Sequence, residues 1–267
     1  MKNLCIVAIA TLLAISCKKE SAADFGPNDK GSIELEFDNV FGSDDLQLNT
    51  ATYTNALDQS INITTINYFI SNIRLKTNSG TEYVVPKDDS YFLITEANET
   101  SQKIELDDVP AGDYTSFTFT VGIDSLKSVA PVAERKGSLD PEGAAGGMYW
   151  NLNSGYIFMK LEGSSPAAST AGNKFQYHVG GFGGYDAPPI NNIKTVTIKA
   201  PFEMVASVRK NKTHPPAVHI FADASKIFNG STNISIAEYP VVELSQQSLT
   251  LANNYAAMFN IDHIHSD

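Results

Sequence analysis

Apolar and polar residues alternate along several short runs of this chain, which is the pattern of strands with one buried face. In residues 32–40, for example, Ile33, Leu35 and Phe37 alternate with acidic side chains. Further runs predict strands over residues 66–76, 81–85, 91–95, 103–106, 115–124, 154–162, 175–179, 193–199, 217–221 and 261–265. Thr, Val, Ile, Tyr and Phe are frequent in these runs, and they favour strands over helices.

Turn residues and two helical patterns complete this picture. Pro110 and Gly112 are spaced as in a turn, and they lead into the next apolar run. Apolar spacing predicts a helix over residues 245–259, and Asp223 is a candidate cap for one or two helical turns. The long segment 125–147 is rich in proline and small residues, and ordered loops of this length are often functional.

No internal repeat and no break in composition divides the chain after its N-terminal segment. We therefore expect a single domain over residues 31–267. Many short strands joined by turns, with few helices, are typical of β-sandwiches. The predicted fold class is mainly β: an antiparallel β-sandwich with long loops and small helical insertions.

The first 30 residues predict export and membrane anchoring. Lys2 precedes an apolar run that is too short to span a bilayer, and small residues then lead to Cys17. Residues 1–16 are therefore interpreted as a lipoprotein signal peptide, and the polar residues 17–30 as a flexible tether. Acylated Cys17 would anchor the domain in the bacterial cell envelope, at the periplasmic or surface face of the outer membrane. A secreted protein with a free Cys17 is the alternative.

Composition narrows the choice of partners. The chain has 267 residues, of which 42% are hydrophobic and 18% charged, as in ordinary packed domains. Its formal net charge of −11 argues against a nucleic acid as the partner. An acidic surface is compatible with cation binding, although most acidic surfaces only maintain solubility.

Histidines are the first candidates for chemistry. His263 and His265 are two residues apart in a predicted strand, so their side chains share one face and can hold one metal ion. His178 lies beside a glycine-rich turn, where another group can approach the backbone closely. His219 faces away from its apolar neighbours and is expected to have no direct role. Taken one by one, each of these histidines is also compatible with a structural or solvated side chain.

The sequence contains none of the common catalytic motifs. It has no Gly-x-Ser-x-Gly, no His-Glu-x-x-His, no phosphate-binding loop and no dinucleotide fingerprint. Three Asp pairs in turn-like segments could hold calcium, but they are more simply interpreted as solvated carboxylates: Asp44–Asp45, Asp88–Asp89 and Asp107–Asp108. We therefore expect a protein that is not an enzyme.

Four segments resemble the MbnP-like copper-binding proteins. They are residues 147–150, which contain the only Trp, residues 155–163, residues 177–180 and residues 258–265. The resemblance implies an envelope protein with a mostly β fold that binds copper through histidines. It also implies a kynurenine, formed from Trp by a di-haem enzyme related to cytochrome c peroxidase.

Carried onto this chain, the resemblance implies a metal site of Trp150, His178, His263 and His265. Leu152 departs from the pattern, because many relatives have a second Trp there. If that second Trp is the one that is oxidised, this chain forms no kynurenine, and imidazoles alone would hold the copper. Kynurenine derived from Trp150 is the other interpretation.

The sequence thus predicts a lipid-anchored envelope protein that binds copper for acquisition, storage or delivery. The expected partners are the copper ion, a di-haem peroxidase-like enzyme and, through the lipid, a membrane. The alternative is a surface β-sandwich module that binds glycan or protein and holds no metal.

Overall fold

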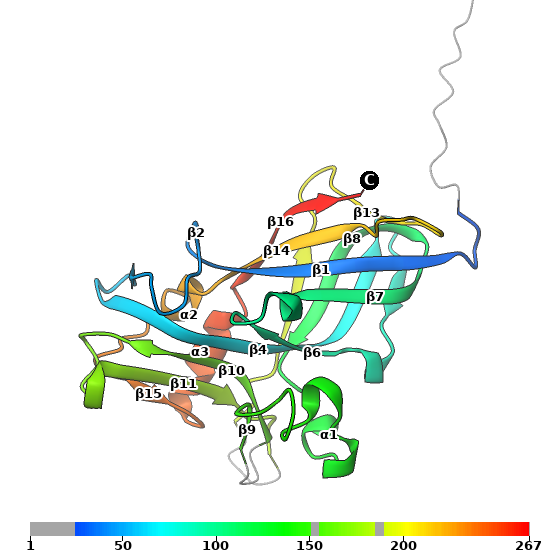
Figure 1. Ribbon diagram of the computed structural model, residues 1–267. Coiled ribbons are helices and arrows are strands. Elements are labelled where there is room, and N and C mark those ends of the chain that lie inside the picture. The colour runs from blue at the N-terminus through cyan, green and yellow to red at the C-terminus, as the bar shows by residue number, and fades with distance from the viewer. Residues whose placement is uncertain (1–24, 151–154, 185–189, 267) are drawn as a thin grey trace, which may run out of the picture.

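The structure is a computed structural model that describes residues 25–150, 155–184 and 190–266 (Figure 1). The predicted signal peptide, Cys17, most of the tether and Leu152 lie outside the described residues. The described part of the chain folds into two β-sheets with three short α-helices.

A five-stranded sheet carries both ends of the domain. Its strand order is β16 (Phe259–His265), β14 (Ala217–Asp223), β1 (Lys30–Phe41) and β2 (Asp44–Asp45), and β7 (Lys103–Pro110) also pairs with β1. β1 and β14 are parallel, whereas the other pairs of this sheet are antiparallel. The sheet therefore joins the first strand of the domain to β14 and to the last strand, and these three lie together in the upper part of Figure 1.

An eleven-stranded sheet forms most of the rest. Its main order is β12 (Lys194–Lys199), β8 (Gly112–Val121), β4 (Ser60–Thr77), β10 (Gly155–Ser164), β11 (Lys174–Gly180) and β15 (Val241–Val242). Short strands extend it: β3 (Tyr53–Thr54), β5 (Glu82–Val84) and β6 (Tyr91–Thr95) on β4, β13 (Ala206–Val208) on β8, and β9 (Tyr149–Trp150) on β10. β11 and β15 are parallel. The mainly β prediction is confirmed, with two parallel pairs in sheets that are otherwise antiparallel.

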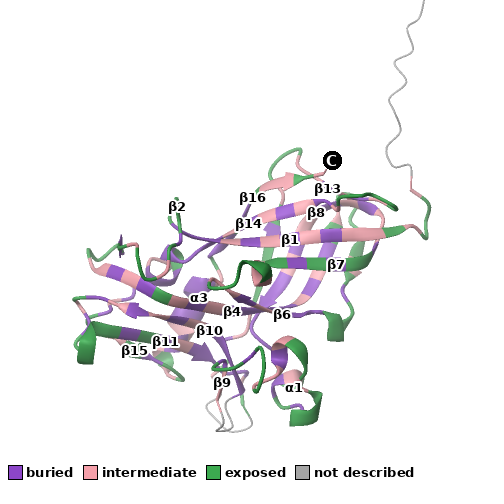
Figure 2. Cartoon of the chain, viewed as in Figure 1, coloured by how far each residue is buried: buried purple, intermediate pink, exposed green. Residues whose placement is uncertain are grey.

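Aromatic side chains fill the space between the two sheets. Phe37 on β1 lies 5.5 Å from Phe119 on β8, measured between ring centroids, and Phe259 at the start of β16 lies 5.1 Å from Phe119. All three are buried. Figure 2 shows buried and more exposed residues alternating along β1, as its sequence pattern predicts. The acidic residues of β1 are consequently on the outer face of the five-stranded sheet.

Helices are few and short. They are α1 (Ser125–Ser128), α2 (Ser225–Phe228) and α3 (Gln246–Tyr255). Ser245 precedes α3 at its N-terminal cap position, and the Asp223 carboxylate, the predicted cap, accepts a hydrogen bond from the Ser225 backbone N–H at α2. None of these helices has the length and hydrophobicity needed to cross a membrane.

Candidate metal centre

A row of four charged or ionisable side chains crosses the outer face of the five-stranded sheet. Lys103 on β7 is the register partner of Glu36 on β1, Glu36 is that of His219 on β14, and His219 is that of His263 on β16. The neighbours of Glu36 and His219 along each strand, such as Leu35 and Val218, are completely buried on the other face. Sheet pairing thus brings together residues that are far apart in the sequence.

A β-bulge in β16 directs His263 outward. The register of β14 and β16 shifts between His219 and Ile220, whose partners are His263 and Ile261, so Asp262 is the extra residue. Ile261 and Ile264 both pack against the core. Strict alternation would have placed Ile261 and His263 on the same face. The bulge therefore puts His263 on the outer face, and His265 follows it there by the ordinary two-residue period.

His219, His263 and His265 form one cluster (hereafter the histidine cluster). Each offers a ring nitrogen, and the three nitrogens all lie within 4.8 Å of one another. Nε2 of His263 is 3.1 Å from Nε2 of His265. The rings of His219 and His263 are stacked, with centroids 4.1 Å apart and planes 12° from parallel, and the ring of His265 lies across both.

Two of these imidazoles contact a carboxylate through Nδ1. Asp262 Oδ2 is 2.6 Å from Nδ1 of His263. Glu36 Oε2 is 3.3 Å from Nδ1 of His219, and its other oxygen is 3.1 Å from the Lys103 ammonium. Each contact uses Nδ1, which leaves Nε2 of these two histidines for another ligand.

The surroundings of His219 favour its uncharged form. Burial is the main cause that lowers the pKa of His219 below its usual value, and His263, His265 and Lys103 act in the same direction, while Glu36 opposes them. On the same face of β1, burial raises the pKa of Asp38, and the nearby Asp45 and Glu36 raise it further. A neutral imidazole among carboxylates is the state in which a histidine can coordinate a cation.

The spacing of the ring nitrogens suits a metal ion. With metal–nitrogen bonds of about 2.0–2.1 Å, two neighbouring ligand nitrogens lie about 2.9–3.4 Å apart. The 3.1 Å between Nε2 of His263 and Nε2 of His265 falls in this range. The side chains of His219 and His263 are 23% and 39% exposed, so an ion can reach the cluster from solvent.

The structure brings together two of the four residues that the sequence placed in one metal site. His263 and His265 are neighbours, as predicted, but His219 takes the third position. His178 lies on β11 of the eleven-stranded sheet, where its Nε2 is 2.7 Å from Glu162 Oε1. It is separated from the cluster, because β11 lies in the lower part of Figure 1 and β16 near the top.

Trp150 is also away from the histidine cluster. It lies on β9, which is at the bottom of Figure 1, whereas β16 is near the top. Its half-buried ring packs over Gly180, where a Cβ atom would come within 2.6 Å of the Trp150 ring. His178 is two residues from Gly180 on β11, so Trp150 and His178 belong to the same region of the eleven-stranded sheet, away from His263 and His265.

Sequence reasoning missed three contributors: His219, Asp262 and Glu36. The alternation around His219 did show that its side chain faces outward. Its role depends on β14 lying beside β16, and nothing in the local sequence reveals that pairing. The bulge at Asp262 has a weak local signal, since Ile261 and Ile264 are spaced for a common inner face only if one residue between them is extra.

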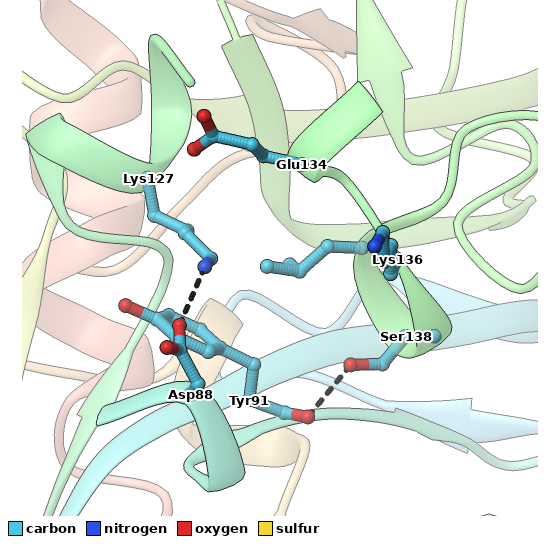
Figure 3. A pocket seen from close by; sticks show the side chains of 8 residues that line it. Asp88, Tyr91, Lys127, Glu134, Lys136 and Ser138 are labelled. Carbon is cyan, nitrogen blue, oxygen red and sulfur yellow. Dashed lines mark hydrogen bonds and ion pairs between the residues drawn. The ribbon is translucent and has the colours of Figure 1, made fainter. Parts of the chain in front are cut away.

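A separate polar hollow of about 470 Å³ lies beside α1 (Figure 3). Within it Lys127 donates to Asp88 at 2.8 Å, and Ser138 donates to the Tyr91 carbonyl at 2.6 Å. Burial, together with a hydrogen bond to Asp124, raises the pKa of the Tyr91 hydroxyl far above its usual range. The segment 125–147, expected from the sequence to be a functional loop, supplies most of this lining.

The fold and the histidine cluster define the class of this protein: a mainly β protein with a candidate metal centre on a sheet face. The chain belongs to the MbnP family, whose sequence profile matches residues 30–248. The match includes Trp150, His178 and His219 and ends before β16. MbnP from Methylosinus trichosporium is a similar solved structure, with 15% identity, 81% of this chain and 82% of that chain covered, and a TM-score of 0.49. No curated protein matches the chain.

Proposed function

We propose that this chain is a lipid-anchored protein of the bacterial cell envelope that binds copper for acquisition, storage or delivery and catalyses no reaction itself. The observation that carries the proposal is the convergence of the ring nitrogens of His219, His263 and His265 within 4.8 Å. Membership of the MbnP family supports copper as the metal, because the sequence resemblance implies copper binding.

The chemistry of the donors also favours copper. Neutral imidazole is a good ligand for copper and zinc, and copper stands highest in the affinity order of the first-row divalent metals. The carboxylates of Glu36 and Asp262 add negative charge beside the cluster, which attracts a cation and helps to balance its charge. With imidazoles as the ligands, the site needs no modified residue.

Oxidation of Trp150 to kynurenine by a di-haem partner would be a separate event in this proposal. Trp150 is on β9, at the bottom of Figure 1 and far from β16, so a product formed there would not complete the histidine cluster. It would lie near His178 instead. Intact mass of the protein, with and without the partner enzyme, tests whether this modification occurs.

Copper titration of the soluble domain, started after Cys17, tests the proposal. We expect one copper ion per chain, bound in competition with a chelator of known affinity, and loss of this binding in the double variant His263→Ala/His265→Ala. His214→Ala is the matched control, because His214 is exposed in a loop. Equal binding by the wild type, the control and the double variant would show that the copper site is elsewhere.

The second candidate function is a surface module that binds a glycan or another polar ligand. The hollow beside α1 favours it, since an aromatic ring, two ammonium groups and two carboxylates line it. A glycan array with the soluble domain would discriminate between the two functions. Binding that Tyr91→Ala abolishes, with no uptake of copper, would favour this candidate.

A further inference from the structure

We propose that Asp262 and Glu36 are positioning residues of the histidine cluster. Asp262 fixes the tautomer of His263 through a hydrogen bond, and the negative charge of Glu36 favours the proton on Nδ1 of His219, so that both histidines present Nε2 to the metal before it arrives. The inference rests on the proposed function, because it concerns the same site, but it can fail separately.

The contact between Asp262 and His263 is the stronger of the two. An ionised carboxylate only accepts hydrogen bonds, so the 2.6 Å contact requires that Nδ1 of His263 carries the proton. The lone pair of a neutral His263 is then on Nε2, the atom that faces His265. Asp262 can make this contact because the bulge places it on the same face as His263.

Glu36 acts on His219 from the adjacent strand. Its Oε2 atom is 3.3 Å from Nδ1 of His219, and Lys103 holds its Oε1 atom at 3.1 Å. Lys103 and His219 therefore fix the carboxylate between them, in the row that crosses β7, β1 and β14. Metal-binding histidines are commonly oriented by a carboxylate on the second ring nitrogen in this way.

His265 differs from the other two histidines. Among the described residues, the one hydrogen bond of its side chain is the 3.1 Å contact between its Nε2 and Nε2 of His263. Since Nε2 of His263 has the lone pair, Nε2 of His265 must donate the proton. This proton lies between the two nitrogens, both of which would need a free lone pair to hold a metal ion.

A neutral His265 can bind a metal through Nε2 only after its proton moves from Nε2 to Nδ1. Water takes the proton from Nε2 and returns one to Nδ1, so the ring stays neutral and no net proton is released. No electron transfer is involved. His263 and His219 would present Nε2 from the start, whereas His265 would present it only after this change of tautomer.

Imidazole nitrogen NMR of the metal-free soluble domain, combined with copper titration, tests this inference. We expect His263 in the Nδ1–H tautomer in the wild type, a weaker preference in Asp262→Asn, whose amide oxygen can still accept, and a loss of this preference in Asp262→Ala. Copper affinity should fall about 10–100-fold in Asp262→Asn and in Glu36→Gln. The matched charge controls Asp44→Asn and Glu34→Gln remove one carboxylate each without touching a histidine, and should change affinity by less than about threefold.

The possible failures are distinct. If Asp262→Asn and Glu36→Gln bind copper like the wild type, or if the tautomer of His263 is unchanged in both Asp262 variants, the positioning role is overturned while copper binding stands. If the wild type binds no copper, the proposed function is overturned. A loss of affinity of the same size in the charge controls would show that Asp262 and Glu36 act only through general electrostatic attraction of the cation. That result would also overturn the inference.

Discussion

His219 and His263 stack face to face across the β14–β16 pair, with ring centroids 4.1 Å apart and planes 12° from parallel. They are also register partners in the sheet. Two imidazolium ions in this arrangement would repel each other, so the pair favours neutral rings. The structure thus holds two ligand-competent histidines together through sheet pairing rather than through a loop.

The first prediction concerns His219, which the sequence alone did not assign to the site. His219→Ala removes one of three ligands, and we expect copper affinity to fall at least about tenfold, which corresponds to about 1.4 kcal/mol of binding free energy. Chelator competition on the soluble domain measures it. The exposed His214 offers the comparison: a loss as large in His214→Ala as in His219→Ala would refute a specific role for His219.

The second prediction separates the histidine cluster from the Trp150 region. His178 binds Glu162 on the eleven-stranded sheet, so we expect His178→Ala to change copper affinity by less than about threefold. The same titration measures it. A loss comparable to that of His263→Ala would mean that copper binds beside Trp150 and His178, and it would restore the site that the sequence predicted.

The third prediction uses the pH dependence of folding. Burial raises the pKa of Glu96 to about 7, Asp45 and Asp38 raise it too, and the hydrogen bond from Asn39 opposes them. The folded state then binds more protons than the unfolded state between about pH 4.5 and 7, so stability should fall as the pH rises through this window. The shift corresponds to roughly 3 kcal/mol, which we reduce to about 1 kcal/mol because the side chain is only half-buried and solvent screens it.

Glu96→Gln should remove this dependence. The amide oxygen can still accept from Asn39 and Gln102, which contact Glu96 at 2.9 and 3.0 Å. Urea unfolding at pH 5 and pH 8 should show a variant that is more stable than the wild type at pH 8 by about 1 kcal/mol and similar at pH 5. A variant destabilised equally at both pH values would contradict the assignment.

The fourth prediction concerns the packing of Trp150 on Gly180. A Cβ at residue 180 would come within 2.4 Å of the Tyr156 carbonyl oxygen and 2.6 Å of the Trp150 ring. We expect Gly180→Ala to lower the free energy of unfolding by about 1–3 kcal/mol and to shift the fluorescence of the only Trp. Copper affinity should be unchanged. Gly26→Ala, where the nearest neighbour is a flexible side chain, is the control, and equal stability of the two variants would contradict the packing.

Much of the fold could be predicted from the sequence because its strands have one buried face. The residues around Phe37 alternate strictly between apolar and polar. The strand predicted from them begins and ends within two residues of β1. The strand at residues 91–95 agrees with β6. The two-residue strand β15 was missed, because two residues are too few to show a period.

Only the part of the site that lies within a single strand could be predicted from the sequence. His263 and His265 could be paired because both follow the bulge and share the two-residue period of one strand. The third ligand could not, because it depends on the order of strands in the sheet. Glu36 contacts His219 because β1 pairs in parallel with β14, and most of the chain lies between these two strands in the sequence.

The position of the bound metal tests the central claim most directly. Crystals of the copper-loaded soluble domain, measured at the copper absorption edge, give an anomalous difference map that locates the ion. We expect one peak about 2.0–2.1 Å from Nε2 of His263 and from Nε2 of His265, with His219 as the third ligand. A peak beside His178 and Trp150 instead, or no peak at the histidine cluster in a protein that binds copper in solution, would contradict the account.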